Sequence, residues 1–397
     1  MAGKVIVVGG SLGGLFAANL LLRAGWDVHV YERAAEELQG RGAGIVTHPE
    51  LFEALALAGI PAGESLGVQV QERVTLDTDG SRIAACRLPQ TLTAWSRLYQ
   101  TLRSGLPDAR YHTGKHLVSF TQEAGGVEAR FADGEAAKAD LLVAADGIRS
   151  TVRQQLLPRL RPVYAGYLAW RGLVEESALS EQARRDVFPY FAFGLPPNEQ
   201  MIAYPVAGRH NSVAPGQRRY NFVWYRPVDE EALRDMLIDG DGKLWADGIP
   251  PPLIRQELLD AARRDARRML APQFAELVEK TTALLFQPIH DLESPRLVFG
   301  RVTLLGDCAF VARPHCGMGV TKAAGDAVAL AQALRDAASI ESALERYEVR
   351  RLAFGREVVR HAQELGAYLE ATARGRPPAS GLTRTPEAVM ANTAVPL

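Results

Sequence analysis

The sequence has few cysteines, and the ones it has are poorly placed for disulfides or metals. Its 397 residues include only three, Cys86, Cys308 and Cys316, and none belongs to a C-x-x-C pair. Three cysteines cannot all pair with one another, which fits a reducing compartment and argues against a zinc site. We therefore expect a cytoplasmic protein without a bound metal.

Charge of one sign and long apolar runs are also missing. Lys and Arg number 45 and Asp and Glu 46, so the formal net charge is −1. This balance leaves no broad basic field for nucleic acid or an anionic membrane. No stretch of about 18 uninterrupted apolar residues occurs, so no transmembrane helix is expected. Glycines interrupt the apolar start of the chain, which we interpret as a strand and not as a signal peptide.

What is present is an ordinary globular composition, with 47% hydrophobic and 23% charged residues. The length predicts two or three domains. The β-branched run Val5–Val8, a glycine turn, a helical pattern over 15–24 and the strand-like run "DVHVYE" over 27–32 predict a strand–helix–strand unit. Further predictions are helices over 49–58, 96–106, 253–285 and 340–373, a hairpin over 69–87, a buried strand over 139–147 and antiparallel strands over 163–226.

The first glycine turn reads "VVGGSLGG" and departs from the dinucleotide-binding pattern G-x-G-x-x-G. Gly9 and Gly14 occupy the outer glycine positions, and Ser11 stands where the second glycine belongs. That middle position must be small, because the backbone approaches a pyrophosphate there, at the N-terminus of a helix. Serine is the next smallest option, and its hydroxyl could bind a phosphate or cap the helix.

Glu32 ends the second predicted strand, at the place where dinucleotide sites carry an acidic residue. Its carboxylate can accept both hydrogen bonds of an adenosine ribose and repels a 2′-phosphate, so this turn is unsuited to NADP. Taken alone, the motif also fits a glycine-rich turn that binds nothing.

Two further motifs follow in the chain. One is "DLLVAADGIRSTVR" at Asp140–Arg153, and the other is "GRVTLLGDCAFVARPHCGMG" at Gly300–Gly319. With the first turn, they occur in the order and rough spacing of the FAD-dependent aromatic hydroxylases, the single-component monooxygenases of the para-hydroxybenzoate hydroxylase type. The sequence resembles that family over about residues 3–370.

The resemblance implies an α/β fold, with a three-layer, Rossmann-like FAD-binding domain and an inserted, mostly antiparallel β-sheet domain for the substrate. The FAD domain would comprise residues 1–160 and, with the C-terminal helix, 296–373. The sheet domain would comprise 161–295. The Pro-, Thr- and Gly-rich composition of residues 374–397 predicts an extended or disordered tail. The candidate FAD-binding residues are Gly9, Ser11, Leu12, Gly14, Glu32, Arg33, Arg41, His48, Asp146, Gly306, Asp307, Pro314, Gly317, Met318 and Gly319. Arg41 is included because it could supply the charge of an arginine that relatives carry elsewhere, and a solvated loop arginine fits it equally well.

Some residues depart from the family pattern. Phe310, and not histidine, follows Ala309, and Trp95 stands where relatives carry an arginine. Runs such as "RGAGIVTHPEL", "YAGYLAWRG" and "RPHCGMG" look most like a branch that acts on pyridine rings, the 2,6-dihydroxypyridine 3-hydroxylase-like proteins.

The activity that the resemblance implies is monooxygenation. NADH or NADPH would reduce FAD, O₂ would form a flavin C4a-hydroperoxide, and this would hydroxylate an electron-rich hydroxylated aromatic or N-heteroaromatic ring. The alternatives are another ring, such as 6-hydroxynicotinate or a hydroxybenzoate, and an FAD reductase or oxidase that hydroxylates nothing. A homodimer is plausible by the same resemblance.

Four aromatic residues of the predicted sheet are candidates for the substrate wall: Phe193, Tyr204, Trp224 and Tyr225. Each is also the type of residue expected in the core of the sheet, without contact to a substrate. A base for the ring hydroxyl should have a pKa near working pH, which favours histidine. His315, in the loop expected at the flavin, is the first candidate for both catalysis and substrate binding, with His290 and His48 as alternatives. Tyr204 is a further candidate for a catalytic role.

Overall fold

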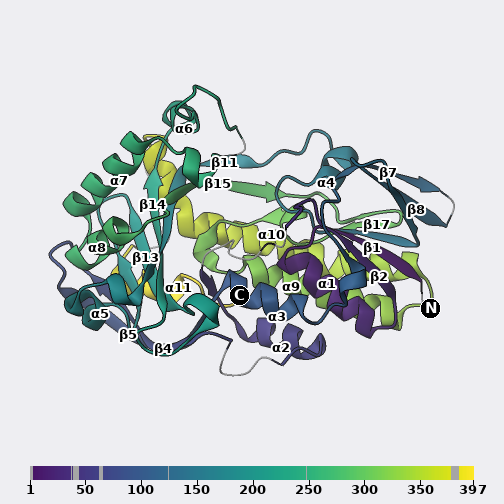
Figure 1. The fold of residues 1–397 in the computed structure, drawn as a ribbon, viewed down its shortest axis with the longest axis horizontal. Helices are drawn as coiled ribbons and strands as arrows, with labels where there is room; N and C mark the ends of the chain where they lie inside the picture. The colour runs from purple at the N-terminus through teal and green to yellow at the C-terminus, as the bar shows by residue number, and fades with distance from the viewer. Residues whose placement is uncertain are drawn as a thin grey trace.

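The computed structural model describes residues 3–36, 38, 44–61, 66–123, 125–246, 248–376 and 384–397. These residues form a six-stranded, a nine-stranded and a three-stranded sheet. In Figure 1 the six-stranded and nine-stranded sheets lie toward opposite ends of the molecule, and the long helix α10 runs between them.

The helices are α1 Leu12–Arg23, α2 Pro49–Leu57, α3 Trp95–Arg103, α4 Thr151–Leu156, α5 Glu181–Asp186, α6 Glu230–Met236, α7 Gln256–Met269, α8 Pro272–Lys280, α9 Gly319–Asp336, α10 Ile340–Ala373 and α11 Pro386–Asn392. The strands are β1 Lys4–Val8, β2 Asp27–Tyr31, β3 Gly44–Val46, β4 Val68–Leu76, β5 Arg82–Ala94, β6 Tyr111–His112, β7 Leu117–Glu123, β8 Gly126–Phe131, β9 Ala136–Ala139, β10 Leu141–Ala144, β11 Val163–Glu175, β12 Phe191–Gly194, β13 Gln200–Val206, β14 Arg219–Pro227, β15 Leu285–Glu293, β16 Val298–Phe299, β17 Val302–Leu304 and β18 Phe310–Val311.

The six-stranded sheet has the order β16-β17-β10-β1-β2-β6, and only the edge strand β16 is antiparallel to its neighbour. Its central strands are buried on both faces, as their apolar runs predict. The carboxyl ends of parallel strands meet at one edge, so the residues that follow β1, β2, β10 and β17 lie together there. All three predicted motifs follow these strands.

The nine-stranded sheet has the order β18-β15-β11-β14-β13-β12-β4-β5-β3, and it is antiparallel except for the pair β12–β4. Residues on one face pack against α7 and α8. Those on the other face pack with Leu369 of α10 and Met390 of α11. Because β3, β4 and β5 come from residues 44–94, the sheet is larger than the predicted insertion at 161–295.

The single helix predicted over 253–285 is wrong. Leu270 has extended backbone angles after α7, and Pro272 occupies the first turn of α8. Proline removes a helical N–H and is tolerated only in a first turn, so it starts a second helix there. The segment then becomes strand β15 at Leu285.

The prediction of an extended or disordered tail is also wrong for residues 386–392. They form α11, with Thr385 as its N-cap and Pro386 in its first turn. Met390 is fully buried against the nine-stranded sheet. The tail's high content of Pro, Thr and Gly concealed a short helix whose stability comes from packing.

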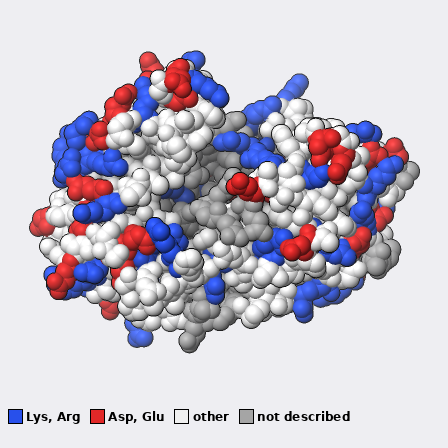
Figure 2. All heavy atoms as spheres, viewed as in Figure 1, with Lys and Arg blue, Asp and Glu red and all other residues white. Residues whose placement is uncertain are grey.

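The visible surface carries both signs of charge. Figure 2 shows Lys and Arg interspersed with Asp and Glu over both ends of the molecule. Within the described residues, no helix combines the length and the apolar character needed to cross a bilayer.

Candidate active site

The first turn after β1 is built for close backbone approach. Gly9 has φ +104°, and a Cβ there would lie 2.4 Å from the carbonyl oxygen of Ala145. A Cβ on Gly14 would lie 1.9 Å from the carbonyl oxygen of Gly9. Both positions therefore require glycine. Ser11 sits at the N-cap of α1, but its side chain makes no capping hydrogen bond and stays available to a ligand.

Glu32 fixes the same turn from the neighbouring strand. Its carboxylate accepts hydrogen bonds from the backbone N–H groups of Gly10, at 2.8 Å, and Ala34, at 2.9 Å. Each carboxylate oxygen has further lone pairs for ribose hydroxyls. The carboxylate is thus held in place before any nucleotide arrives.

These residues open onto a cavity of about 250 Å³, which we call the nucleotide cavity. Its polar wall combines acidic groups with cations that suit phosphates. The lining residues are Val8, Gly9, Ser11, Tyr31, Glu32, Arg33, Leu38, Trp95, Lys115, His116, Leu117, Ala145, Asp146, Gly147, Arg149 and Thr151.

The Asp-Gly motif contributes Asp146 to this cavity. One carboxylate oxygen of Asp146 accepts from the backbone N–H of Val152 at 3.2 Å, and the other is buried without a hydrogen-bond partner. Arg153 has a different role, because its guanidinium donates to the carbonyl oxygens of Cys308, at 3.0 Å, and Ile148. Arg153 therefore ties the second motif to the third.

A second cavity, of about 310 Å³, lies between the third motif and the nine-stranded sheet; we call it the ring cavity. Trp95 lines both cavities, so they adjoin at its side chain. The other lining residues are Gly44, Ile45, Val46, Ile148, Arg171, Phe191, Ile202, Tyr204, Val223, Tyr225, Gln287, Pro288, Ile289, His290, Asp307, Val311, Ala312, Pro314, His315, Gly317, Gly319, Val320, Thr393 and Ala394.

The loop between β18 and α9, residues 312–318, forms one wall of the ring cavity, and we call it the flavin loop. A short 3-10 turn at Pro314–Cys316 ends at Gly317, which has the left-handed φ of +66°. Helix α9 begins at Gly319 and directs its positive end toward this wall. Lys322, in the first turn of α9, is buried, and its Nζ lies 4.0 Å from a carboxylate oxygen of Asp307 without any hydrogen-bond partner.

His315 is buried within this wall. Its Nε2 lies 3.0 Å from the hydroxyl of Tyr167, and its ring stacks on Tyr225 at 4.0 Å between centroids. Burial, aided by the nearby Arg313 charge, lowers the pKa of His315 to about 3. His315 is therefore neutral at neutral pH, and its pKa lies well below the near-neutral value expected of a catalytic base.

Arg171 brings a positive charge to the opposite wall, from the centre of β11. Its Nε has no hydrogen-bond partner, and among the described residues no carboxylate forms an ion pair with it. Burial raises the pKa of Tyr204 and of Tyr225, and the Arg171 charge partly offsets this in both cases. The guanidinium is thus close enough to act on both hydroxyls.

Most of the predicted site residues come together. The nucleotide cavity gathers Gly9, Ser11, Glu32, Arg33 and Asp146. The ring cavity gathers Tyr204, Tyr225, His290, Asp307, Pro314, His315, Gly317 and Gly319. A larger open groove of about 980 Å³, beside α10, contains none of the predicted residues.

Trp224 is a wrong prediction for the substrate wall. Successive side chains of a strand point to opposite faces, so Trp224 and its neighbour Tyr225 cannot share one. Trp224 packs on the α7 and α8 side, where its Nε1 donates to Glu199 at 2.7 Å. Phe193 lies on the same face as Tyr225 but does not line the ring cavity, and its ring stacks on that of Phe191 at 4.9 Å.

The remaining predicted residues do not line either cavity. Leu12 is buried in the core, a Cβ on Gly14 would collide with Gly9, and Gly306 has φ +67°. His48 Nδ1 lies 3.1 Å from the sulfur of Met318. Arg41 lies outside the described residues.

Sequence reasoning missed several lining residues. Phe191, Ile202 and Val223 each lie two positions before a predicted aromatic residue on the same strand, so strict alternation would have found them. For Arg171 the signal was a single charge within an apolar strand. No signal in the sequence indicated Thr393 and Ala394.

A dinucleotide cradle that opens into an aromatic cavity defines a flavin-dependent oxidoreductase acting on a small ring. The residues fit FAD, because an uncapped Ser11 hydroxyl, a preset Glu32 carboxylate and an orphaned Asp146 oxygen all occur at the nucleotide end.

Comparisons with known proteins agree with this assignment. The sequence family described as FAD binding domain-like matches residues 164–291. The 2,6-dihydroxypyridine 3-monooxygenase of Paenarthrobacter nicotinovorans is 32% identical over 369 residues, which cover 92% of this chain and 91% of that protein. The structure of 2,6-dihydroxypyridine-3-hydroxylase from Arthrobacter nicotinovorans matches with a TM-score of 0.88 and 31% identity, covering 97% of this chain and 98% of that one. Klebsiella pneumoniae HpxO complexed with FAD and uric acid matches with a TM-score of 0.75 and 26% identity, covering 98% and 91%.

The chain belongs to the FAD-dependent aromatic hydroxylases, monooxygenases that act on aromatic rings with FAD as cofactor. The family prediction made from three ordered motifs is confirmed.

Proposed function

We propose that the protein hydroxylates a small pyridine ring that carries hydroxyl groups, of the 2,6-dihydroxypyridine kind, with NADH or NADPH as electron donor. The observation that carries this proposal is Arg171, a cation without a carboxylate partner among the described residues, which lines a cavity of about 310 Å³. The similarity to 2,6-dihydroxypyridine 3-monooxygenase over 92% of the chain supports the same ring class.

Arg171 suits a substrate whose ring hydroxyl is ionised. A guanidinium stabilises an oxyanion through charge-assisted hydrogen bonds, which lowers the hydroxyl's pKa. Loss of that proton makes the ring more electron-rich and thus more reactive toward an electrophilic oxygen. The chain's contribution at this step is therefore to hold the reactive, deprotonated form of the ring.

The other walls position the ring and keep it dry. Tyr204 and Tyr225 remain neutral because burial raises their pKa values, so their hydroxyls can donate hydrogen bonds to ring substituents. Phe191, Ile202 and Val223 supply apolar surface. FAD, when bound, supplies activation of O₂ and transfer of one oxygen atom, chemistry that protein side chains lack.

His315 takes a positioning role in this proposal. With a pKa lowered to about 3, it is a weak base. Its stacking on Tyr225 and its contact with Tyr167 hold the flavin loop against the sheet. His290, which also lines the ring cavity, stays a candidate for proton transfer.

The test is a screen of single rings for stimulated NADH or NADPH oxidation. We expect 2,6-dihydroxypyridine to accelerate oxidation and to give a product heavier by one oxygen atom. A response confined to 6-hydroxynicotinate or a hydroxybenzoate would assign that ring, and not a dihydroxypyridine, as the substrate. Oxidation that yields only H₂O₂ with every ring would replace the proposal with an FAD reductase or oxidase.

We also propose a cytoplasmic, homodimeric protein. Three free cysteines are compatible with a reducing compartment. Light scattering on the purified holoenzyme tests the dimer, and a monomeric mass at micromolar concentration would reject it.

A further inference from the structure

The segment after the last long helix is anchored at two points. Residues 384–397 include α11, which packs against β4 and β5. Met390 of α11 belongs to the same buried cluster as Phe191, Tyr204 and Tyr225, three residues of the ring cavity. The segment is therefore part of the substrate-side core.

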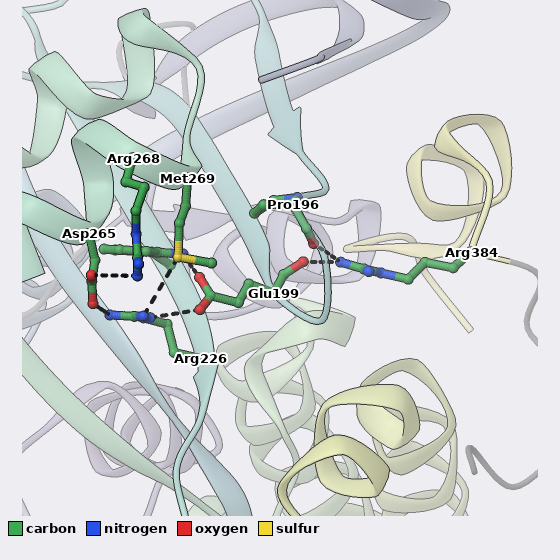
Figure 3. A network of polar contacts seen from close by, with 8 residues as sticks. Pro196, Glu199, Arg226, Asp265, Arg268, Met269 and Arg384 are labelled. Carbon is green, nitrogen blue, oxygen red and sulfur yellow. Dashed lines mark hydrogen bonds and ion pairs between the residues drawn. The ribbon is translucent and has the colours of Figure 1, made fainter. Parts of the chain in front are cut away.

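Arg384 makes the first anchor, shown in Figure 3. Its guanidinium donates to the carbonyl oxygens of Pro196, at 3.0 Å, and Glu199, in the turn between β12 and β13. The guanidinium also stacks over the ring of Tyr368 at 4.3 Å. The Glu199 carboxylate in turn pairs with Arg226 at 2.9 Å. The first anchor is therefore connected, through Glu199, to the ion pair with Arg226.

Arg73 makes the second anchor and is completely buried in β4. Its guanidinium donates to the carbonyl oxygens of Met390, Thr393 and Ala394, at 2.5, 2.6 and 3.2 Å. These carbonyls lie at the negative end of α11, where a helix leaves acceptors without partners. Burial lowers the pKa of Arg73 to about 10, so it stays charged at neutral pH.

The second anchor holds the segment against the flavin loop. The backbone N–H of Ala394 donates to the carbonyl oxygen of His315 at 2.8 Å. A Cβ on Gly317 would lie 3.0 Å from the Cβ of Ala394. Thr393 and Ala394 both line the ring cavity, and the Arg73 guanidinium lies 4.7 Å from the ring of Phe191, which lines it too.

We propose that residues 384–397 form a specificity-determining wall of the ring cavity, and that Arg73 is the positioning residue that holds this wall against the flavin loop. This inference rests on the proposed function, in which the ring cavity receives the substrate. The buried Arg73 guanidinium binds three backbone carbonyl groups at the end of α11. These hydrogen bonds hold Thr393 and Ala394 beside His315. Loosening the wall enlarges the space around the ring and admits water.

The experiment compares Arg73→Met and Ala394→Gly with the wild-type holoenzyme. Ala394 has φ +53°, so glycine fits its backbone and removes only the methyl group that lines the wall. For Arg73→Met we expect a rise in substrate KM of about tenfold, the scale of one or two lost hydrogen bonds. We expect several-fold more H₂O₂ per NADH oxidised, and a smaller change in the same direction for Ala394→Gly. FAD affinity stays within about twofold of wild type, because no residue of the segment lines the nucleotide cavity.

Arg218→Met is the matched control. Like Arg73, Arg218 stacks over a phenylalanine, Phe188, but its partner is a buried carboxylate, Glu176 at 2.8 Å, and it lines neither cavity. The Arg218→Met variant should have a lower melting temperature but the KM, coupling and ring selectivity of the wild type. If Arg73→Met and Ala394→Gly behave like this control, the wall is overturned and Arg73 is only a helix cap.

Iodide quenching of bound-flavin fluorescence keeps the test independent of the substrate. Arg73→Met should increase the quenching constant, since the wall borders the flavin loop. If the wild type hydroxylates no hydroxypyridine while quenching still rises in Arg73→Met, the proposed function fails and the wall stands. Unchanged quenching rejects the wall, whatever the substrate.

Discussion

The Nε2 atom of His315 lies 3.0 Å from the hydroxyl of Tyr167, a tyrosine with no exposed surface. Burial raises the pKa of Tyr167 well above its ordinary value, so its hydroxyl is neutral. The flavin loop is thus joined to strand β11 through a neutral histidine–tyrosine pair. Because both side chains are neutral, their contact positions the flavin loop without placing a charge beside the ring cavity.

Replacing His315 should separate cofactor binding from hydroxylation. We expect His315→Ala to keep bound FAD but to uncouple NADH oxidation from hydroxylation by about tenfold, because the loop loses its stack on Tyr225 and its contact with Tyr167. Tyr167→Phe removes the contact alone and should show a smaller effect. H₂O₂ release per NADH measures both, and wild-type coupling in His315→Ala would reject this role.

The pH dependence of stability should report the same histidine. Its folded pKa of about 3 lies below the unfolded value near 6.5. Below that unfolded pKa the unfolded chain binds a proton that the folded chain does not. Stability is therefore lost as pH falls from about 6.5 toward 3, by at most about 1.4 kcal/mol per pH unit from this group.

Urea unfolding of the wild type and His315→Gln at a series of pH values tests this slope. Other histidines titrate in both proteins, so the difference between the two curves isolates His315. The curves should diverge below the unfolded pKa, with the wild type falling faster. Parallel curves would show that His315 is not held neutral.

Arg171 should govern substrate affinity and the acidity of the bound ring. Arg171→Met should raise KM by about tenfold to a hundredfold, the cost of a charge-assisted hydrogen bond. It should also raise the pH at which kcat/KM increases, because the ring hydroxyl keeps its higher solution pKa. Arg171→Lys should restore part of the pH shift. A pH profile unchanged in Arg171→Met would contradict the oxyanion role.

Glu32 should control FAD affinity. Glu32→Ala removes the acceptor for Gly10 and Ala34 N–H groups and any ribose contact, so we expect FAD to bind about a hundredfold more weakly. The exposed Glu36, four residues along, supplies the control Glu36→Ala. Fluorescence titration of the apoenzymes measures both, and equal affinities would remove Glu32 from the nucleotide site.

The nucleotide end of the site was predictable from sequence because it depends on the backbone. Gly9 and Gly14 are demanded by contacts shorter than any side chain allows, and Glu32 by its place at the end of a strand. Such constraints act within a short stretch of chain, so they leave a fixed spacing in the sequence. The helix predicted over 340–373 also rests on a local sequence pattern, and the structure confirms it.

The substrate end was predictable only in part, because it depends on which face of the sheet a residue occupies. Tyr225 reaches the cavity and Trp224 does not, although both are aromatic and adjacent. Alternation gives two possible phases, and only the packing of α7 and α8 decides between them. Arg73 and Ala394 are separated by more than three hundred positions in the chain, so their contact leaves no local pattern.

Lys322 should tune the redox chemistry of the bound cofactor. Its buried Nζ has no hydrogen-bond partner, and its nearest carboxylate oxygen, on Asp307, is 4.0 Å away. The residue lies in the first turn of α9, whose positive end already favours a negative charge at the flavin loop. Reduced flavin is an anion, so a second positive charge here should stabilise it over the oxidised form.

Lys322→Met should lower the midpoint potential of bound FAD by on the order of 30 mV, which for two electrons corresponds to about tenfold in the equilibrium constant. It should also weaken the flavin–sulfite adduct, which carries the same negative charge. The exposed Lys280, at the end of α8, gives the control Lys280→Met, whose potential should match the wild type. A wild-type potential in Lys322→Met together with weaker FAD binding would instead assign the charge of Lys322 to the pyrophosphate.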